Sequence, residues 1–224
     1  MKINKFFTVT AFILMTAVLV LAGVDTTPHN FTSSSQSPNA FFYGTGQLCV
    51  FCHTPHNGNQ TLGAALWNHE TNESQTYQMY NSNTMDMTQS AQPHKGSLVC
   101  LSCHDGTIAI NSLNNVPGPD LAGTYGSPGG TNLDGSGRLT ASSHAYVGTD
   151  LTDDHPVGIT YDASRDVGNF NAKTGVAANY PDRLLSEGLY VECASCHDAH
   201  DNTYSNFLVE DNSGSQLCLR CHIK

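Results

Sequence analysis

The sequence predicts a mostly irregular chain with a few short helices, in place of a conventional layered domain. Only 39% of its 224 residues are hydrophobic and 12% are charged, and this charged share is about half that of an average soluble protein. Glycine, serine, threonine and asparagine fill long stretches, so too few apolar residues remain to build two packed layers of regular elements. We therefore expect material other than side chains to fill much of the interior.

The N-terminus has the features of an export signal. Two lysines precede an apolar run at 6–21, and the small residues Ala22 and Gly23 follow it. We expect residues 1–22 to be a cleaved signal peptide and the mature chain to be exported, either to the cell surface and extracellular space or to the periplasm. The alternative is an uncleaved anchor, because the run approaches the roughly 18 to 20 residues that a spanning helix needs.

The charge balance argues against nucleic acid as a partner. Nine lysines and arginines stand against 19 aspartates and glutamates, which gives a formal net charge of −10. Such a surface repels phosphate backbones.

The cysteines indicate the chemistry. All eight fall into four Cys-x-x-Cys pairs, and a histidine follows each pair directly. These motifs, numbered 1 to 4 along the chain, are Cys49, Cys52 and His53; Cys100, Cys103 and His104; Cys193, Cys196 and His197; and Cys218, Cys221 and His222. The pattern C-x-x-C-H is the attachment signature of c-type haem, in which two thiols hold the porphyrin edge and the histidine binds iron. The sequence therefore predicts four covalent haems c and a chain wrapped around a row of haems.

Three other readings of the cysteines remain open but explain less. A disulfide scaffold gives no reason for the paired spacing or the four histidines. The last two pairs have a separation near that of a zinc ribbon, but the earlier gaps between pairs are far too long for one zinc site. A thioredoxin-like site needs one pair on a βαβ scaffold, and the sequence has no such alternation.

Seven further histidines can supply the four remaining axial positions. His56 and His200 each follow a motif histidine by three residues. Neighbours at this spacing on a turn lie about 5 to 6 Å apart, whereas two axial ligands approach iron from opposite faces of a wide ring. Each must therefore serve the iron of another haem, which brings two haems into near contact, or else only hydrogen-bond a haem carboxylate or a nearby loop.

Two more histidines are expected to ligate iron. His155 precedes Val157, Ile159 and Tyr161, which alternate as in an extended strand and would fix the backbone that carries the ligand. His29 lies close to the expected mature N-terminus, where it can reach a haem in its own chain or in a neighbouring one.

The other histidines are expected to have structural roles or to be exposed. His69 follows Trp67 and is the first reserve ligand, whereas His94 and His144 lie in polar surroundings. The mature chain also has three methionines, Met79, Met85 and Met87. With histidines to spare, we expect histidine on every iron, which gives low-spin centres with no vacant position for a substrate.

The pattern CxxCHxxH followed by CxxCH occurs twice along the chain. This repetition predicts two haem pairs. The first pair covers 23–116, a Gly- and Ser-rich linker covers 117–150 and the second pair covers 151–224. The clearest helix signal lies in PDRLLSEGL, with Pro181 at its start and Gly188 as its stop.

Several stretches carry a family resemblance: CVFCHTPH, LWNH, CLSCHDG, DHPVG, CASCHDAH, NFL and LCLRCH. They resemble those of bacterial multihaem cytochromes with doubled CxxCH motifs, and the last is the most specific. The whole mature chain is similar to the tetrahaem outer-surface cytochromes, OmcE-like, that polymerise into extracellular filaments in metal-reducing bacteria.

This resemblance implies bis-histidine haems stacked in a continuous chain and self-association into a filament, in which a histidine of one subunit can ligate a haem of the next. It also implies other multihaem cytochromes as electron donors, and extracellular metal oxides or cytochromes as acceptors. The positions that match the family's distal ligands are His29, His56, His155 and His200. The family more commonly has arginine after LWN, so the role of His69 stays open.

The expected function is that of an electron carrier and not of an enzyme, with no catalytic residues. The carrier is either a filament subunit or a monomeric periplasmic shuttle. A multihaem oxidoreductase is the second class, but such enzymes need an open or lysine-ligated iron and no CxxCK motif is present. A haem-storage protein is the third class, in which the haems would lie too far apart to exchange electrons.

Overall fold

The computed structural model describes residues 23–32, 46–62, 64, 66–116, 132–173 and 185–224. The expected signal peptide at 1–22, the linker up to 131 and the start of the expected helix at 181–184 lie outside these ranges. Within them, short helices and a small sheet are joined by long stretches of turn and coil, which confirms the predicted fold class. No helix in these ranges is both long and apolar enough to cross a membrane.

The regular elements are short. The α-helices are α2 (Lys95–His104) and α4 (Cys193–Cys196). The 3-10 helices are η1 (Gly23–Thr26), η2 (Leu48–Phe51), η3 (Ala163–Arg165), η4 (Ser205–Phe207), η5 (Ser213–Ser215) and η6 (Cys218–Arg220). Each of the four CxxCH motifs lies on or at the end of one of these helices.

An antiparallel sheet joins distant parts of the chain. Its strands are β1 (Thr88–Gln89), β2 (Ile159–Thr160) and β3 (Tyr190–Val191), in the order β1-β2-β3. The alternation around Ile159 predicted an extended strand, and β2 confirms it as the middle strand. Because β1 precedes α2 and β3 directly precedes α4, the sheet brings the starts of these two helices together.

The described part of the expected helix at 181–188 is a turn. The amide of Gly188 donates to the carbonyl of Leu185 (2.9 Å) and Ser186 pairs with Tyr190. Gly188 has φ +65°, a conformation that glycine adopts without strain. The chain therefore reverses within the described residues 185–190 and enters β3 directly before motif 3.

The hydrophobic core is divided among three small clusters in the described part of the chain. One contains Val50 and Phe51 from motif 1 together with Leu133 and Leu139 from the linker. A second surrounds Ile159 and reaches motif 4, and a third surrounds Leu101 of α2. Side chains alone thus form only a sparse interior, as the composition predicted.

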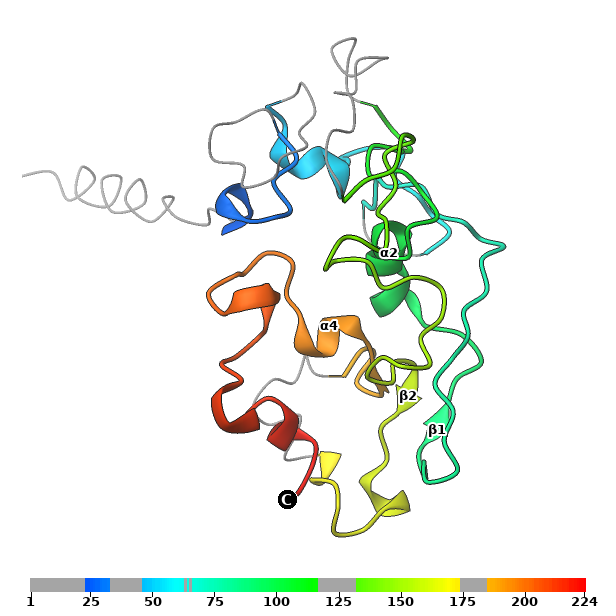
Figure 1. Cartoon of the computed structure of the whole chain (residues 1–224), viewed down its shortest axis with the longest axis vertical. Helices are drawn as coiled ribbons and strands as arrows, with labels where there is room; N and C mark the ends of the chain where they lie inside the picture. The colour runs from blue at the N-terminus through cyan, green and yellow to red at the C-terminus, as the bar shows by residue number, and fades with distance from the viewer. Residues whose placement is uncertain (1–22, 33–45, 63, 65, 117–131, 174–184) are drawn as a thin grey trace, which may run out of the picture.

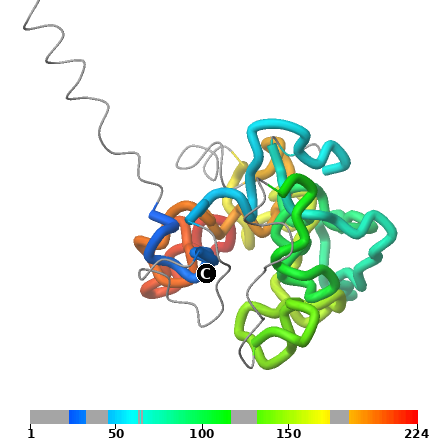
Figure 2. The backbone as a smooth tube through the Cα atoms, turned by 90° about the horizontal axis from the view of Figure 1, so that it is seen from above, coloured from blue at the N-terminus to red at the C-terminus, as the bar shows by residue number. Residues whose placement is uncertain are grey.

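The four motifs follow one another along the molecule (Figure 1). Motif 1 lies near the top of that view, α2 and α4 lie in the middle, and motif 4 lies near the C-terminus at the bottom. The N-terminal segment runs beside the C-terminal half (Figure 2). The ring of His29 stacks on that of Phe207 with 4.5 Å between centroids, so the N-terminal segment reaches the neighbourhood of motif 3.

Candidate haem site

Each motif forms about one helical turn, which brings its two cysteines and its histidine to one side of the backbone. In motifs 1, 3 and 4 the histidine amide donates to the carbonyl of the first cysteine, over 2.8 Å for His53, 3.1 Å for His197 and 2.9 Å for His222. Motif 2 is the last turn of α2, and Asp105 caps it by donating its amide to the carbonyl of Leu101 (3.0 Å). Each of the four motifs therefore presents two thiols and one imidazole on the same side of its backbone.

A glycine after motif 2 permits tight packing. Gly106 has φ +70°, and a Cβ placed on it would lie 2.5 Å from the ring of Tyr146 and 2.6 Å from the carbonyl of Leu139. Only glycine avoids both the strain and the collision. The residue lets the segment around Tyr146 close over His104, whose Nδ1 lies 2.6 Å from the carbonyl of Ala145.

None of the eight cysteines is joined to another in a disulfide. Burial raises the pKa of Cys52 to about 12 and that of Cys103 to about 12, and burial raises the pKa of Cys196 to about 11. Among the described residues, no group of three or more His, Cys, Asp or Glu side chains is placed to hold a metal ion such as zinc.

Three of the four motif histidines face a second histidine. The ring centroids are 5.9 Å apart for His53 and His200, 6.1 Å for His104 and His29, and 6.4 Å for His222 and His155. An imidazole nitrogen binds a metal at about 2 Å and lies roughly 1 Å from its own ring centre, so two imidazoles on opposite sides of one metal have centres about 6 Å apart. The spacing of all three pairs fits a haem iron held between two imidazoles.

A buried donor near motif 1 also fits a bound group. Nε1 of Trp67 is buried and has no hydrogen-bond partner in the described ranges, and the indole ring lies 6.2 Å from the ring of His53. A buried N–H without an acceptor is costly. The carboxylates of haem are acceptors of the required kind.

Four of the six paired imidazoles are shifted toward the neutral state that binds metals. Burial, with a smaller contribution from His104, lowers the pKa of His29 to about 4. Burial also lowers the pKa values of His53, His104 and His222. At neutral pH these rings are neutral, and a neutral ring nitrogen carries the lone pair that a metal needs.

Backbone carbonyls orient several of the rings. Nδ1 of His197 lies 2.8 Å from the carbonyl of Asn206, and Nδ1 of His155 lies 3.1 Å from that of Pro156. A carbonyl at Nδ1 holds the proton there and leaves Nε2 for the metal. His104 has the same arrangement.

The remaining two predicted ligands are not paired. Neither His197 nor His56 has a histidine ring opposite it at such a spacing in the described ranges, and both residues are exposed. His197 nevertheless lies near enough to His104 to add to the lowering, by burial, of the pKa of that ring. The backbone carbonyl of His56 accepts hydrogen bonds from Thr54 and Asn115. His56 follows His53 at the same spacing as His200 follows His197, so His56 is the counterpart in motif 1 of His200, whose ring lies opposite that of His53.

The other three histidines lie apart from these pairs. His69 is fully buried, with Nδ1 2.8 Å from the carbonyl of Glu70 and Nε2 3.0 Å from that of Ala109. Both of its nitrogens are engaged, so its role in this structure is structural. His144 is exposed, as expected. His94 was expected to be exposed too, but that prediction is wrong: its side chain is 30% exposed and Nδ1 lies 2.8 Å from the buried carboxylate of Glu192.

The comparisons with known proteins agree with this chemistry at the C-terminus. The doubled CXXCH motif family matches residues 188–224, which contain motifs 3 and 4. No curated protein matches the chain. This part of the chain thus carries a feature of multihaem c-type cytochromes, namely covalent haem c binding of the kind used for electron transfer.

Proposed function

We propose that the chain is an exported tetrahaem c-type cytochrome that transfers electrons through closely spaced haems, each with two histidine ligands. The observation that carries the proposal is the 5.9 to 6.4 Å spacing of three histidine pairs, each containing one motif histidine. Haem iron supplies a one-electron Fe(III)/Fe(II) couple. The chain holds the porphyrins through its eight cysteines, and its carbonyls fix the imidazoles that approach the irons.

For the fourth haem we propose the pair His197 and His56. His200, three residues after His197, faces His53, and reciprocal use of His56 gives motifs 1 and 3 the same arrangement. Two motifs that exchange distal histidines in this way hold their haems in near contact. Such contact is the requirement for fast electron hopping.

A second candidate is a multihaem oxidoreductase, which the exposed and unpaired ring of His197 favours. An iron with an open axial position can bind a substrate. Electron paramagnetic resonance of the oxidised, purified protein separates the two functions. The carrier gives low-spin signals for all haems, whereas a high-spin signal from one haem per chain would contradict the four bis-histidine sites and support the enzyme.

We further propose that copies of the chain assemble into an extracellular filament. Exposed apolar side chains occur toward both ends of the molecule: Leu66 (52% exposed) near motif 1, and Val167 (84%) and Ile223 (44%) near motif 4. Ile223 donates its amide to the carbonyl of Asn169 (2.8 Å), which brings it beside the segment with Val167. Exposed apolar side chains at both ends permit head-to-tail association, which forms open fibres when the rotation between copies does not close a ring.

In this assembly other multihaem cytochromes supply the electrons, and metal oxides or cytochromes outside the cell accept them. Electron microscopy of material sheared from the cell surface tests the assembly. Ordered thin fibres that contain this chain support it. A chain found only as a soluble monomer overturns the filament and favours the periplasmic shuttle.

A further inference from the structure

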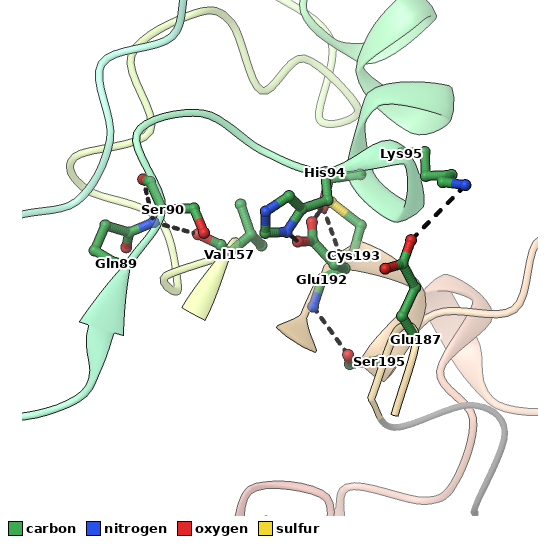
Figure 3. A network of polar contacts seen from close by, with 10 residues as sticks. Gln89, Ser90, His94, Lys95, Val157, Glu187, Glu192, Cys193 and Ser195 are labelled. Atoms are coloured by element: carbon green, nitrogen blue, oxygen red, sulfur yellow. Dashed lines mark hydrogen bonds and ion pairs between the residues drawn. The ribbon is translucent and has the colours of Figure 1, made fainter. Parts of the chain in front are cut away.

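The helices that carry motifs 2 and 3 pack against each other near the middle of the molecule. The contact is made by the first turns of α2 and by the segment 186–193 that leads into α4 (Figure 3). It joins the two expected haem pairs, so it lies on one route by which an electron can cross between the halves of the chain.

A buried carboxylate lies at the centre of the junction. The side chain of Glu192 is fully buried and receives three contacts. The amide of Ser195 donates to it within α4, the hydroxyl of Ser97 donates to it from α2, and Nδ1 of His94 lies 2.8 Å from its Oε1. Glu192 therefore caps the helix of motif 3 and is bonded to the helix of motif 2 at the same time.

Ser97 completes the connection. Its hydroxyl is also buried, and while it donates to Glu192 it accepts a hydrogen bond from the amide of Cys193 (3.0 Å). One serine of α2 is thus bonded to two consecutive residues of the opposite segment. Buried polar groups that are fully satisfied in this way favour one arrangement of their elements, because shifting either element leaves them unpaired.

The two helices come close because α2 has a glycine at the contact. A Cβ on Gly96 would lie 3.1 Å from Oγ of Ser186 and 3.3 Å from Cβ of Glu192. The backbone at Gly96 therefore rests directly against the segment that carries Glu192. A larger residue would push the two helices apart.

The junction also brings two haem-attachment sites together. Cys100 in motif 2 and Cys193 in motif 3 lie close to each other across the contact. Glu192 precedes Cys193 directly. Its carboxyl group is therefore held next to the point where the attachment sites meet.

From this geometry we infer that Glu192 is a positioning residue for electron transfer between motifs 2 and 3: it fixes the two attachment helices against each other and holds a buried negative charge beside their junction. The inference rests on the proposed function. A buried negative charge stabilises the oxidised, more positive iron, and so lowers the midpoint potentials of nearby haems.

Three substitutions in the full-length haem-loaded protein separate the effect of the charge of Glu192 from the effect of its hydrogen bonds between the helices. Glu192→Gln removes the charge and weakens the hydrogen bonds, Ser97→Ala keeps the charge but removes the bonds between the helices, and Glu187→Gln is the matched control. Glu187 connects the same two segments through Lys95, but this pair spans 3.8 Å and both side chains are more than half exposed. Exposed ion pairs contribute little.

Two readouts are measured besides electron transfer. Redox titration of E192Q should shift two of the four midpoint potentials upward by about 59 mV, which corresponds to a tenfold change in a one-electron equilibrium. Amide hydrogen exchange in 95–104 should become about tenfold faster in both E192Q and S97A, as expected for the loss of a buried hydrogen bond to a charged group. S97A should leave the potentials unchanged, and E187Q should change neither quantity.

Should E192Q not yield haem-loaded protein, the exchange rates of S97A against E187Q decide the matter. Wild-type potentials in E192Q together with wild-type exchange rates in both E192Q and S97A overturn the inference. A response of E187Q equal to that of E192Q overturns it too. A wild-type chain without covalent haem overturns the proposed function and this inference together. Four haems with no response to E192Q overturn this inference alone.

Discussion

The same five-residue motif occurs in two very different surroundings at the centre and at the end of this molecule. Motif 2 lies on α2, the longest helix in the described ranges, where Leu101 is 2% exposed and Ser97 is fully buried. Motif 4 lies on a single 3-10 turn, with Cys218 and His222 exposed. Motif 2 is thus carried by a packed α-helix, whereas motif 4 presents its first cysteine and its histidine at the surface.

Removing a haem attachment should therefore have the largest effect at the centre. In Cys193→Ser/Cys196→Ser the haem of motif 3 is lost from the junction with α2, and we expect most of the protein to misfold or be degraded. In Cys218→Ser/Cys221→Ser only the terminal haem is lost, so the chain should accumulate with three haems. Yields of haem-stained protein together with intact mass measure both. Equal yields of the two double variants would contradict the contrast between centre and end.

Truncating the core of α2 tests how strongly the centre is packed. Leu101→Ala should lower the free energy of unfolding by about 2 to 5 kcal/mol, because the cavity cannot collapse around a rigid helix. The control at the other end, Val167→Ala, should change it by less than about 0.5 kcal/mol, because Val167 is 84% exposed. Denaturant titrations measure both changes. The losses of unfolding free energy in the two variants should differ by at least about 1 kcal/mol if the centre is more tightly packed than the end.

Replacing a distal histidine in each region sharpens the contrast further. Both His29→Ala and His155→Ala should convert one haem from low-spin to high-spin, which absorbance and paramagnetic resonance detect. His29→Ala should also destabilise the fold by roughly 0.5 to 1.5 kcal/mol, because its ring stacks on that of Phe207. The ring of His155 is exposed, so its loss should destabilise the fold less than the loss of His29. A variant whose spin state does not change has lost no ligand.

The smallest effect on the isolated chain is expected at the exposed apolar end. Val167→Asp/Ile223→Asp should leave haem content, spin state and unfolding unchanged, yet reduce fibre formation, because a charge in an apolar contact must be desolvated. Fibre length in electron micrographs is the measurement. Wild-type fibres from the double variant would show that this end does not form the contact between copies.

The sequence predicts the general character of the fold well, for a physical reason. Composition limits how much apolar surface is available, and this alone excludes large layers of helix or sheet. The alternation around Ile159 predicted the one central strand. The helix expected to start at Pro181 shows the limit of local signals, because the described part from Leu185 forms a turn that leads into β3.

Long-range pairings are beyond such local signals. The spacing of His56 and His200 excludes their own haems by geometry, but it cannot say that His200 lies opposite His53. The junction was missed for the same reason: Glu192 and His94 are far apart in sequence, and His94 was expected to be exposed. Two sequence features could have indicated the junction. They are the glutamate directly before motif 3 and the Gly-Ser pair a few residues before motif 2.

The central claim is that porphyrin is bonded covalently to the thiols of all four motifs. The intact mass of the purified mature protein under denaturing conditions tests it most directly. The account predicts a mass equal to that of the mature chain with four haems attached. The mass of the bare chain, with its sulfurs joined in disulfides or released from zinc, would contradict it.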